Sequence, residues 1–530
     1  MSMKNLVAAS AVLVALAGCG GGDVKLGVAT TDNSVDNSTG GGGGGGTTNP
    51  CASYTTAGGT VRQGTFDGTD CTYSSSFVGQ TNPLTVDLTI PLIDGVHIFE
   101  GSLFVGTSVD TAAPAGGEGP TLTIDAGNTL AFSDAADYVL INRGSQIVAN
   151  GTAAAPITFT SYTDAVTGTV GPEDVQQWGG MVINGNGLTN NCSDAERAAD
   201  QCHVVSEGQP SFYGGNDNAD NSGILRYVVL KHTGFEVTAG NELNGVTFNA
   251  VGSGTLVENL QVYSTYDDGI EFFGGAVDVS NFVGLYVRDD TIDYSDGYAG
   301  TIHNALVIQQ VGNGNRCIEA DNINSERAGE ALDTPPVSNP TISNLTCILS
   351  NSDAGTHDPS EGPLFRQGAR VQLLDSIVFG GYLGGGMTAS NECLEVESDV
   401  SLAYAVAGNS TLNTTIVACA EADAAADPSV KGTLANGDSL AQWVLNTSAN
   451  AADYSFNAGN VVITDAANAN VVVLEPGTFY TAAAFADAAA TPFTVGTGQQ
   501  IGAVTSAADW TAGWTYGLHD GNRAQPLWFE

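Results

Sequence analysis

Residues 244–248 read Asn-Gly-Val-Thr-Phe, and residues 268–272 repeat the same pattern as Asp-Gly-Ile-Glu-Phe, 24 positions later. Each copy has a polar residue, a small residue, an aliphatic residue and a second polar residue. The pattern returns at residues 290–294, 316–319 and 392–395. Intervals of 22 to 26 residues between the first four copies match one coil of a parallel β-helix, in which three short strands surround a core. The repeat therefore predicts an all-β fold, a right-handed parallel β-helix.

The segments outside the repeat are also typical of strands. Residues 84–90, 121–124, 138–141 and 156–159 are short runs of β-forming residues between turns rich in Gly, Asn and Asp. No stretch of the body keeps a helical period over three turns. A leucine-rich repeat of similar length would need an asparagine–leucine ladder, which the sequence lacks. A β-sandwich or a propeller would not predict an aliphatic ladder with this spacing.

Several segments are similar to a known family. They include residues 119–127, 153–161, 178–185, 267–275 and 509–514. These segments resemble a widespread family of exported β-helix lipoproteins of Gram-negative bacteria, over roughly residues 80–530. The resemblance implies a right-handed parallel β-helix in a surface or secreted position. It implies no particular activity, because the family has no agreed catalytic residues.

The N-terminus has the features of an export signal. Lys4 supplies a positive charge, residues 6–17 are apolar, and residues 16–19 read Leu-Ala-Gly-Cys, which resembles a lipobox. The apolar run is too short for a transmembrane helix, which needs about 20 residues. The sequence thus predicts lipidation of Cys19, with palmitate-type acyl chains that anchor the protein to a membrane. Gly20 in place of aspartate favours the outer membrane, on its periplasmic or cell-surface face; the alternative is an ordinary secretory signal.

Composition divides the chain into five parts. Residues 1–19 are the signal peptide and lipobox, and residues 20–50, rich in Gly, Ser, Thr and Asn, are a tether. Residues 51–82 are expected to form a disulfide-bearing N-terminal cap, residues 83–430 the β-helix, and residues 431–530 the C-terminal coils and cap. Three tryptophans are expected to close the C-terminal end, with a sugar-binding platform as the alternative role: Trp510, Trp514 and Trp528.

The cysteines support an exported protein. Eight remain once Cys19 is set aside, an even number that suits an oxidising compartment. Zinc binding is disfavoured because no C-x-x-C or Cys/His spacing occurs. Their proximity in the sequence suggests pairing of neighbours, giving these candidate disulfides: Cys51–Cys71, Cys192–Cys202, Cys317–Cys347 and Cys393–Cys419.

The charge excludes some functions. The chain has 57 acidic and 14 basic residues, a formal net charge of −43. Such a surface repels nucleic acid and anionic membranes, and it favours divalent cations. The six histidines share no ligand spacing, and no G-x-S-x-G, H-E-x-x-H or G-K-[ST] motif occurs, so serine hydrolase, metalloprotease and nucleotide-binding functions lack support.

The repeat collects acidic residues at equivalent positions of successive coils. Stacking would bring their carboxylates to about 5 Å from one another, where like charges repel and need a cation, an arginine or shared protons. Carboxylate oxygens are the ligands that calcium prefers, so calcium is the cofactor that we expect. A second acidic cluster lies at residues 217–221, although it lacks the spacing of an EF-hand. The candidate metal ligands are Asp267, Asp268, Asp289, Asp290, Asp293, Asp296, Asp217 and Asp220.

The same acids also permit a catalytic interpretation. Two carboxylates on neighbouring coils could serve as acid and base at a glycosidic bond, and an arginine could serve as the base of a lyase. Arg288 flanks the acids as well, and Tyr266, Tyr294 and Tyr298 are candidates for stacking on sugars. The candidate catalytic residues are Asp268, Glu271, Asp290, Asp293 and Arg316.

A purely structural interpretation remains beside these two. Asp and Asn commonly cap turns, and the aliphatic residues Ile270, Ile292 and Ile318 belong to the core. Of the three, we favour a lipid-anchored, non-catalytic, calcium-stabilised rod that binds polysaccharide or another cell-surface partner. A polysaccharide lyase or glycoside hydrolase acting at the acidic residues is the alternative.

Overall fold

The structure is a computed structural model that describes residues 49–107, 118–207, 211–238, 241–324, 327, 329–350, 359–380, 391–419, 429–463, 501–504 and 509–527. Cys19, the signal peptide, most of the tether and Trp528 lie outside these residues. In the part of the chain that is described, no helix has both the length and the apolar character needed to span a bilayer.

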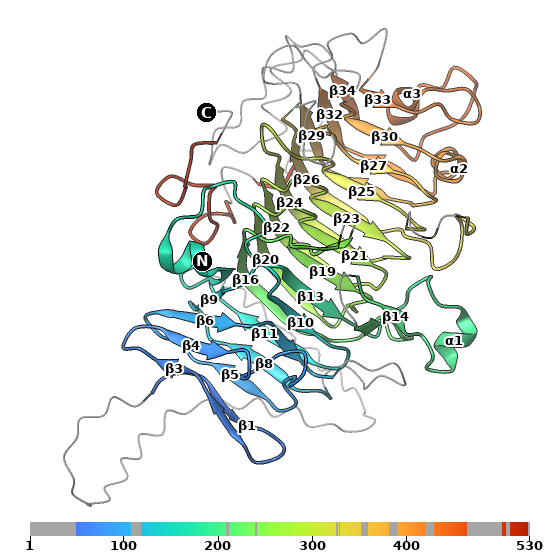
Figure 1. Ribbon diagram of the computed structural model, residues 1–530. Coiled ribbons are helices and arrows are strands. Elements are labelled where there is room, and N and C mark those ends of the chain that lie inside the picture. Colours follow the sequence, from blue (N-terminus) through green and yellow to red (C-terminus); the bar gives the residue numbers. More distant parts are fainter. Residues whose placement is uncertain are drawn as a thin grey trace, which may run out of the picture. The chain divides into compact units, whose positions relative to one another are not determined.

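One face of the molecule is a ten-stranded sheet in which all described neighbours are parallel, with one strand from each coil. The strands stack in chain order (Figure 1). This is the arrangement that the repeat predicts, because each copy of the pattern contributes one strand. The strands are β7 (Leu103–Val105), β10 (Tyr138–Ile141), β13 (Gly180–Asn184), β19 (Val246–Asn249), β21 (Ile270–Phe273), β23 (Ile292–Ser295), β25 (Ile318–Ala320), β27 (Leu364–Phe365), β30 (Leu394–Val396) and β33 (Val430–Lys431).

Among the described residues, eighteen strands form the second sheet, and only β3 and β4 pair antiparallel. They are β3 (Thr65–Phe66), β4 (Cys71–Ser74), β5 (Leu88–Ile90), β6 (Val96–Glu100), β8 (Thr121–Ile124), β9 (Thr129–Phe132), β11 (Gln146–Asn150), β12 (Ile157–Ser161), β16 (Gly223–Lys231), β20 (Leu256–Tyr263), β22 (Asp278–Leu285), β24 (Thr301–Ile308), β26 (Thr341–Ile348), β28 (Gln372–Leu374), β29 (Ile377–Gly380), β31 (Thr411–Asn413), β32 (Ile416–Cys419) and β34 (Val461–Ile463).

This second sheet covers two faces of each coil. Strand β11 pairs with the first part of β16, and β12 pairs with its last part. Strands β28 and β29 divide β26 in the same way. The long strands thus bend around a corner, and each coil has three sides. The prediction of a parallel β-helix is confirmed.

The corner is made by residues in the left-handed region of φ. Five such residues lie within β16, β20, β22, β24 and β26, with φ between 49° and 59°: Tyr227, Asn259, Asn281, Asn304 and Asn344. Asparagine tolerates this conformation better than most side chains. The Asn304 amide nitrogen also donates a hydrogen bond to Asn281 Oδ1 at 3.0 Å. The chain therefore contains an asparagine ladder, at a corner that sequence reasoning did not locate.

The core lies between the sheets and contains the aliphatic residues of the repeat. Val246, Ile270, Ile292 and Ile318 are in register and fully buried. The ring of Phe272 stacks on Phe248, with centroids 5.2 Å apart. Because side chains alternate along a strand, the residues between these apolar positions point outward, as predicted.

Short elements decorate the coils. In the described residues, three pairs of antiparallel strands lie outside the two large sheets. They are β1 (Ser53–Thr55) with β2 (Val61–Gln63), β14 (Val204–Val205) with β15 (Phe212–Tyr213), and β17 (Glu236–Thr238) with β18 (Asn241–Glu242). The described residues also form one π-helical turn and three short α-helices: η1 (Thr163–Thr167), α1 (Asp194–Ala198), α2 (Asp399–Ala407) and α3 (Leu440–Val444).

The described C-terminal residues lie on a flank of the β-helix. Ile501, Leu518 and Leu527 form a second apolar cluster with outward-facing residues of β22, β24 and β26. The side-chain amide of Gln261 in β20 accepts from the Tyr516 backbone N–H and donates to its carbonyl oxygen, both at 2.7 Å. The prediction that tryptophans close the end is therefore wrong for Trp514, whose ring packs against Tyr227 of β16.

All four predicted cysteine pairs are disulfides: Cys51–Cys71, Cys192–Cys202, Cys317–Cys347 and Cys393–Cys419. Disulfides form and persist in oxidising compartments, so this set indicates a protein that functions outside the cytoplasm.

Candidate metal centre

The polar residues that open each copy of the repeat form a continuous column. Asn244 Oδ1 accepts a hydrogen bond from the Asp268 backbone N–H at 3.0 Å, and Asp268 Oδ1 accepts from the Asp290 N–H at 3.0 Å. Asp290 Oδ1 accepts from the Arg316 N–H at 2.8 Å. Each side chain therefore satisfies the backbone of the following coil. This confirms the stacking and gives Asp268 and Asp290 a structural role through one carboxylate oxygen.

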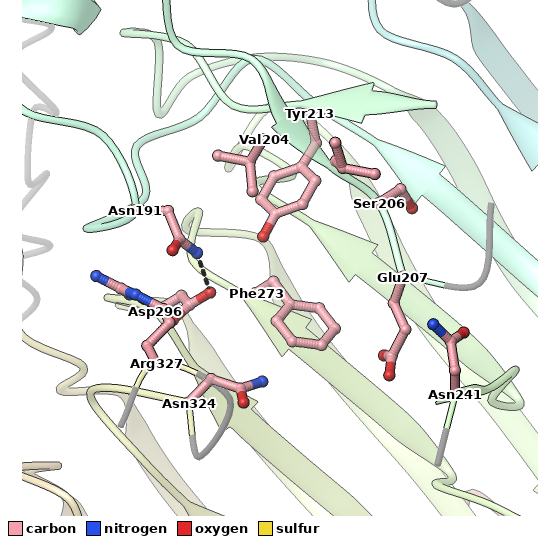
Figure 2. Close-up of a pocket in the computed structure, with 11 residues that line it drawn as sticks. Asn191, Val204, Ser206, Glu207, Tyr213, Asn241, Phe273, Asp296, Asn324 and Arg327 are labelled. Carbon is pink, nitrogen blue, oxygen red and sulfur yellow. Dashed lines mark hydrogen bonds and ion pairs between the residues drawn. The ribbon is translucent and has the colours of Figure 1, made fainter. Parts of the chain in front are cut away.

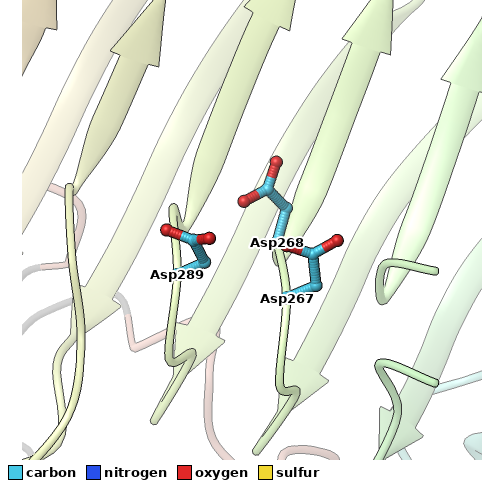
Figure 3. Close-up of side chains that lie close together, drawn as sticks. All are labelled: Asp267, Asp268 and Asp289. Atoms are coloured by element: carbon cyan, nitrogen blue, oxygen red, sulfur yellow. The ribbon is translucent and has the colours of Figure 1, made fainter. Parts of the chain in front are cut away.

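Further acids stand beside this column on the outer face of the ten-stranded sheet. Glu271, Asp293 and Glu319 are in register on β21, β23 and β25. Asp267 and Asp268 lie just before β21, and Asp289 lies on the next coil (Figure 3). We call the following set the acidic column: Asp267, Asp268, Glu271, Asp289, Asp290, Asp293 and Glu319.

The acidic column contains three overlapping groups in which one oxygen per residue lies within 4.8 Å of the others. The groups are Asp267–Asp268–Asp289, Asp268–Glu271–Asp293 and Asp290–Asp293–Glu319. Oxygens at this separation can share one cation, because calcium takes six to eight oxygen ligands at about 2.3–2.6 Å. The geometry therefore fits a metal ion.

Burial makes these carboxylates unfavourable as isolated anions. Desolvation, followed by repulsion from neighbouring carboxylates, raises the pKa of Asp268, Glu271, Asp290 and Asp293 well above their ordinary values. A cation among them would reverse this effect, because it stabilises the charged form.

Basic side chains neutralise only one end of the acidic column. Arg366 pairs with Glu319 and lies 3.0 Å from Asp321. Arg316 pairs with Glu361 at 2.5 Å and Glu395 at 3.2 Å, and acts on Asp290 and Glu319 of the column without a direct ion pair.

The central acids have no such partner. Among the described residues, no basic side chain forms an ion pair with Asp268, Glu271, Asp290 or Asp293. Glu271 accepts a hydrogen bond from the Asn244 amide, whereas Asp293 Oδ1 is shielded from solvent and accepts none. The centre of the column therefore has no direct ion pair among the described residues, and Arg316 and Arg366 act on Asp290 and Asp293 only at longer range.

A fourth acidic group lies further along the sheet and differs in composition. Glu361, Glu392 and Glu395 also bring one oxygen each within 4.8 Å. Lys431 pairs with Glu392, and Arg316 pairs with the other two glutamates. Two cations already occupy this cluster, so it is a weaker candidate for a metal.

Some predicted site residues lie elsewhere. Asp217 accepts a hydrogen bond from the Ala219 backbone N–H in a local turn, whereas Asp220 accepts from Ser222 and from Asn186, 34 residues earlier. Asp296 pairs with Arg327 at 2.9 Å. None of these three acids belongs to a group that could hold a metal in the described residues.

The tyrosines predicted to stack on sugars are mostly in the core. Tyr294 and Tyr298 are fully buried, and their hydroxyls donate to the carbonyl oxygens of Arg370 and Val277. This prediction is wrong for both, because their side chains point into the core. Tyr266 is only partly buried.

A pocket of about 280 Å³ opens at the ends of β21 and β23. Phe273 follows Glu271 by two positions on the same outward side of β21, so the pocket adjoins the acidic column. The loop that carries β14 and β15 forms its other wall (Figure 2). The lining residues are Asn191, Val204, Val205, Ser206, Glu207, Tyr213, Asn241, Phe273, Asp296, Asn324 and Arg327.

The comparison with protein families agrees with this architecture. A family model described as a pectate-lyase-like β-helix domain matches residues 112–444, more than half of the chain. The chain belongs to this family. No curated protein and no solved structure matches it. The acidic column, at residues 267–319, lies within the pectate-lyase-like domain.

Sequence reasoning missed the counter-ion Arg366 and the pocket of this pectate-lyase-like domain. Arg366 lies 47 residues after Glu319, and Tyr213 lies 60 residues before Phe273. Neither residue belongs to a copy of the repeat, so no spacing marks it. The disulfide between Cys192 and Cys202, in the loop before β14, was the one available signal that this insertion is ordered.

Proposed function

We propose that this protein is an exported, lipid-anchored binding protein whose acidic column holds calcium and, through it, extracellular polysaccharide. The observation that carries the proposal is the uncompensated centre of the column, where Asp268, Glu271 and Asp293 bring oxygens within 4.8 Å without a basic partner. Three carboxylates leave several positions of a calcium ion open. Hydroxyl and carboxylate oxygens of a glycan are suitable ligands for those positions.

The geometry favours binding over catalysis. Glu361 and Glu395 raise the pKa of Arg316, so its guanidinium is a poor base for proton abstraction. The central group brings one oxygen from each of three carboxylates within 4.8 Å of the others, whereas glycoside hydrolases use a pair of carboxylates on either side of the sugar bond. A shared cation accounts for three converging carboxylates better than an acid and a base on either side of a sugar.

Calorimetric titration of calcium into the EGTA-treated protein tests the proposal. We expect saturable binding, weakened at least about tenfold by Asp268→Asn combined with Asp293→Asn, because each change removes a charged ligand. Asparagine keeps an Oδ1 acceptor, so the hydrogen bond that position 268 accepts from the Asp290 backbone N–H survives. Asp94→Asn, at an exposed position, is the matched control.

A panel of acidic and neutral polysaccharides tests the partner. We expect retention of a polysaccharide with calcium and its release with EGTA, without cleavage. Absence of saturable calcium binding would overturn the metal site. Turnover of a polysaccharide that Asp290→Ala and Asp293→Ala abolish would replace the binding function by the enzymatic alternative.

A further inference from the structure

The pocket beside the acidic column has its own chemistry. Its aromatic surface comes from Tyr213 and Phe273, whose ring centroids are 6.4 Å apart with an angle of 39° between the planes. Glu207 and Asn241 stand on one side of these rings, and Asn191 and Asp296 stand on the other (Figure 2). Ring faces and oxygen atoms therefore surround the same small space.

The polar groups of the pocket favour a ligand that donates hydrogen bonds. Asn241 Oδ1 is shielded from solvent and has no hydrogen-bond partner in the described structure. A buried acceptor without a donor is costly, and a ligand that carries N–H groups would satisfy it. The carboxylates of Glu207 and Asp296 also line the pocket and add negative charge.

Arg327 also lines the pocket, but it does not make the pocket favourable for an anionic ligand. Arg327 lies 2.9 Å from Asp296 and 2.6 Å from Glu330, and it also donates to the Asn190 carbonyl oxygen at 3.2 Å. These bonds occupy its guanidinium, so it offers an anionic ligand little. Both rings line the pocket, and aromatic faces attract positive charge within about 6 Å of the ring centroid.

We propose that this pocket binds a primary ammonium group on an extended chain, such as a lysine side chain of a basic partner protein. About 280 Å³ is enough for one such side chain. The formal net charge of −43 attracts basic partners over a longer range. The site is separate from the calcium proposal, because it uses the rings and the loop around β14 rather than the centre of the acidic column.

Calorimetry with Nα-acetyl-lysine-N-methylamide tests the site, in EGTA and at about 0.15 M salt to screen general attraction. The norleucine analogue, of similar shape but uncharged, should not bind measurably. Glu207→Gln should weaken lysine-amide binding roughly tenfold, and Phe273→Leu at least about threefold. Glu118→Gln, at an exposed position, should leave it unchanged.

The outcomes separate the proposal from its alternatives. Equal binding of the lysine and norleucine compounds, or equal weakening by Glu118→Gln and Glu207→Gln, would overturn it. Binding of a neutral monosaccharide in place of the lysine compound would overturn it as well. Unchanged circular dichroism of Glu207→Gln and Phe273→Leu would exclude misfolding, and since the titration contains EGTA, failure of the calcium site would not affect the result.

Discussion

Two side chains of the acidic column satisfy the backbone of the next coil, but they also place negative charges in a buried position. Asp268 and Asp290 satisfy backbone N–H groups of the next coil, which explains an oxygen acceptor at that position. Asparagine does the same at position 244 without a charge. The backbone therefore does not require the negative charges, and their concentration at the centre of the column calls for a cation or a proton.

The raised pKa values predict how stability depends on pH without calcium. Burial raises the pKa of Asp321 to about 7 and that of Glu361 to about 9, and the central acids shift in the same direction. A group whose pKa is higher in the folded state stabilises the fold when protonated, and this contribution is lost as pH rises through the folded pKa. In EGTA we expect the melting temperature to rise by about 2–4 °C from pH 8 to pH 6.

Calcium and Asp293→Asn serve as the comparisons for this pH series. Saturating calcium should flatten the dependence, because metal binding requires deprotonated ligands. Asp293→Asn should also reduce the slope, whereas Asp94→Asn should not. A melting temperature that falls steadily from pH 8 to pH 6 in EGTA would contradict the expected dependence. Differential scanning calorimetry provides the measurement.

At the scale of elements, the strands of the second sheet have outward faces that are not uniformly polar. Tyr263, Leu285, Ile308 and Ile348 point away from the main core and pack in the second apolar cluster. The C-terminal residues cover this flank, with Leu518 almost fully buried. The C-terminal segment therefore stabilises the side of the β-helix rather than its end.

We expect Leu518→Ser to lower the free energy of unfolding by about 2–4 kcal/mol, because it removes buried apolar contacts and leaves a cavity. Leu445→Ser is the matched control, since Leu445 is 41% exposed, and it should have little effect. Guanidinium unfolding followed by tryptophan fluorescence measures both variants. Equal stability of the two variants would show that the flank does not depend on this contact.

At the scale of the whole molecule, three features are consistent with a location outside the cytoplasm. They are the disulfides, the net charge of −43 and the lipobox-like residues 16–19. An acidic surface remains soluble but is repelled by anionic membranes, so membrane attachment requires another interaction. Acyl chains on Cys19 would supply it, since each buried methylene contributes about 0.8 kcal/mol.

Metabolic labelling with palmitate tests this attachment. The full-length chain should incorporate label and fractionate with the outer membrane, whereas Cys19→Ser should incorporate none and leave the membrane pellet. Protease accessibility of intact cells would then assign the membrane face. Label that remains in Cys19→Ser would disprove this anchoring site.

The sequence by itself determined the repeat, the inward aliphatic residues and the stacking of Asn244, Asp268, Asp290 and Arg316. It could do so because a β-helix is nearly one-dimensional: a position in one coil lies over the same position in the next, so sequence spacing fixes neighbours. The cysteine pairs followed from the same local order.

Only the tertiary structure decided which residues meet across unequal insertions. The pairing of Arg316 with Glu361 and Glu395, the burial of Tyr294 and Tyr298, and the pocket between Tyr213 and Phe273 belong to this group. So does the placement of the C-terminal segment, which contacts strands more than 200 residues earlier. These contacts depend on side-chain direction and on loops of irregular length, and neither leaves a period in the sequence.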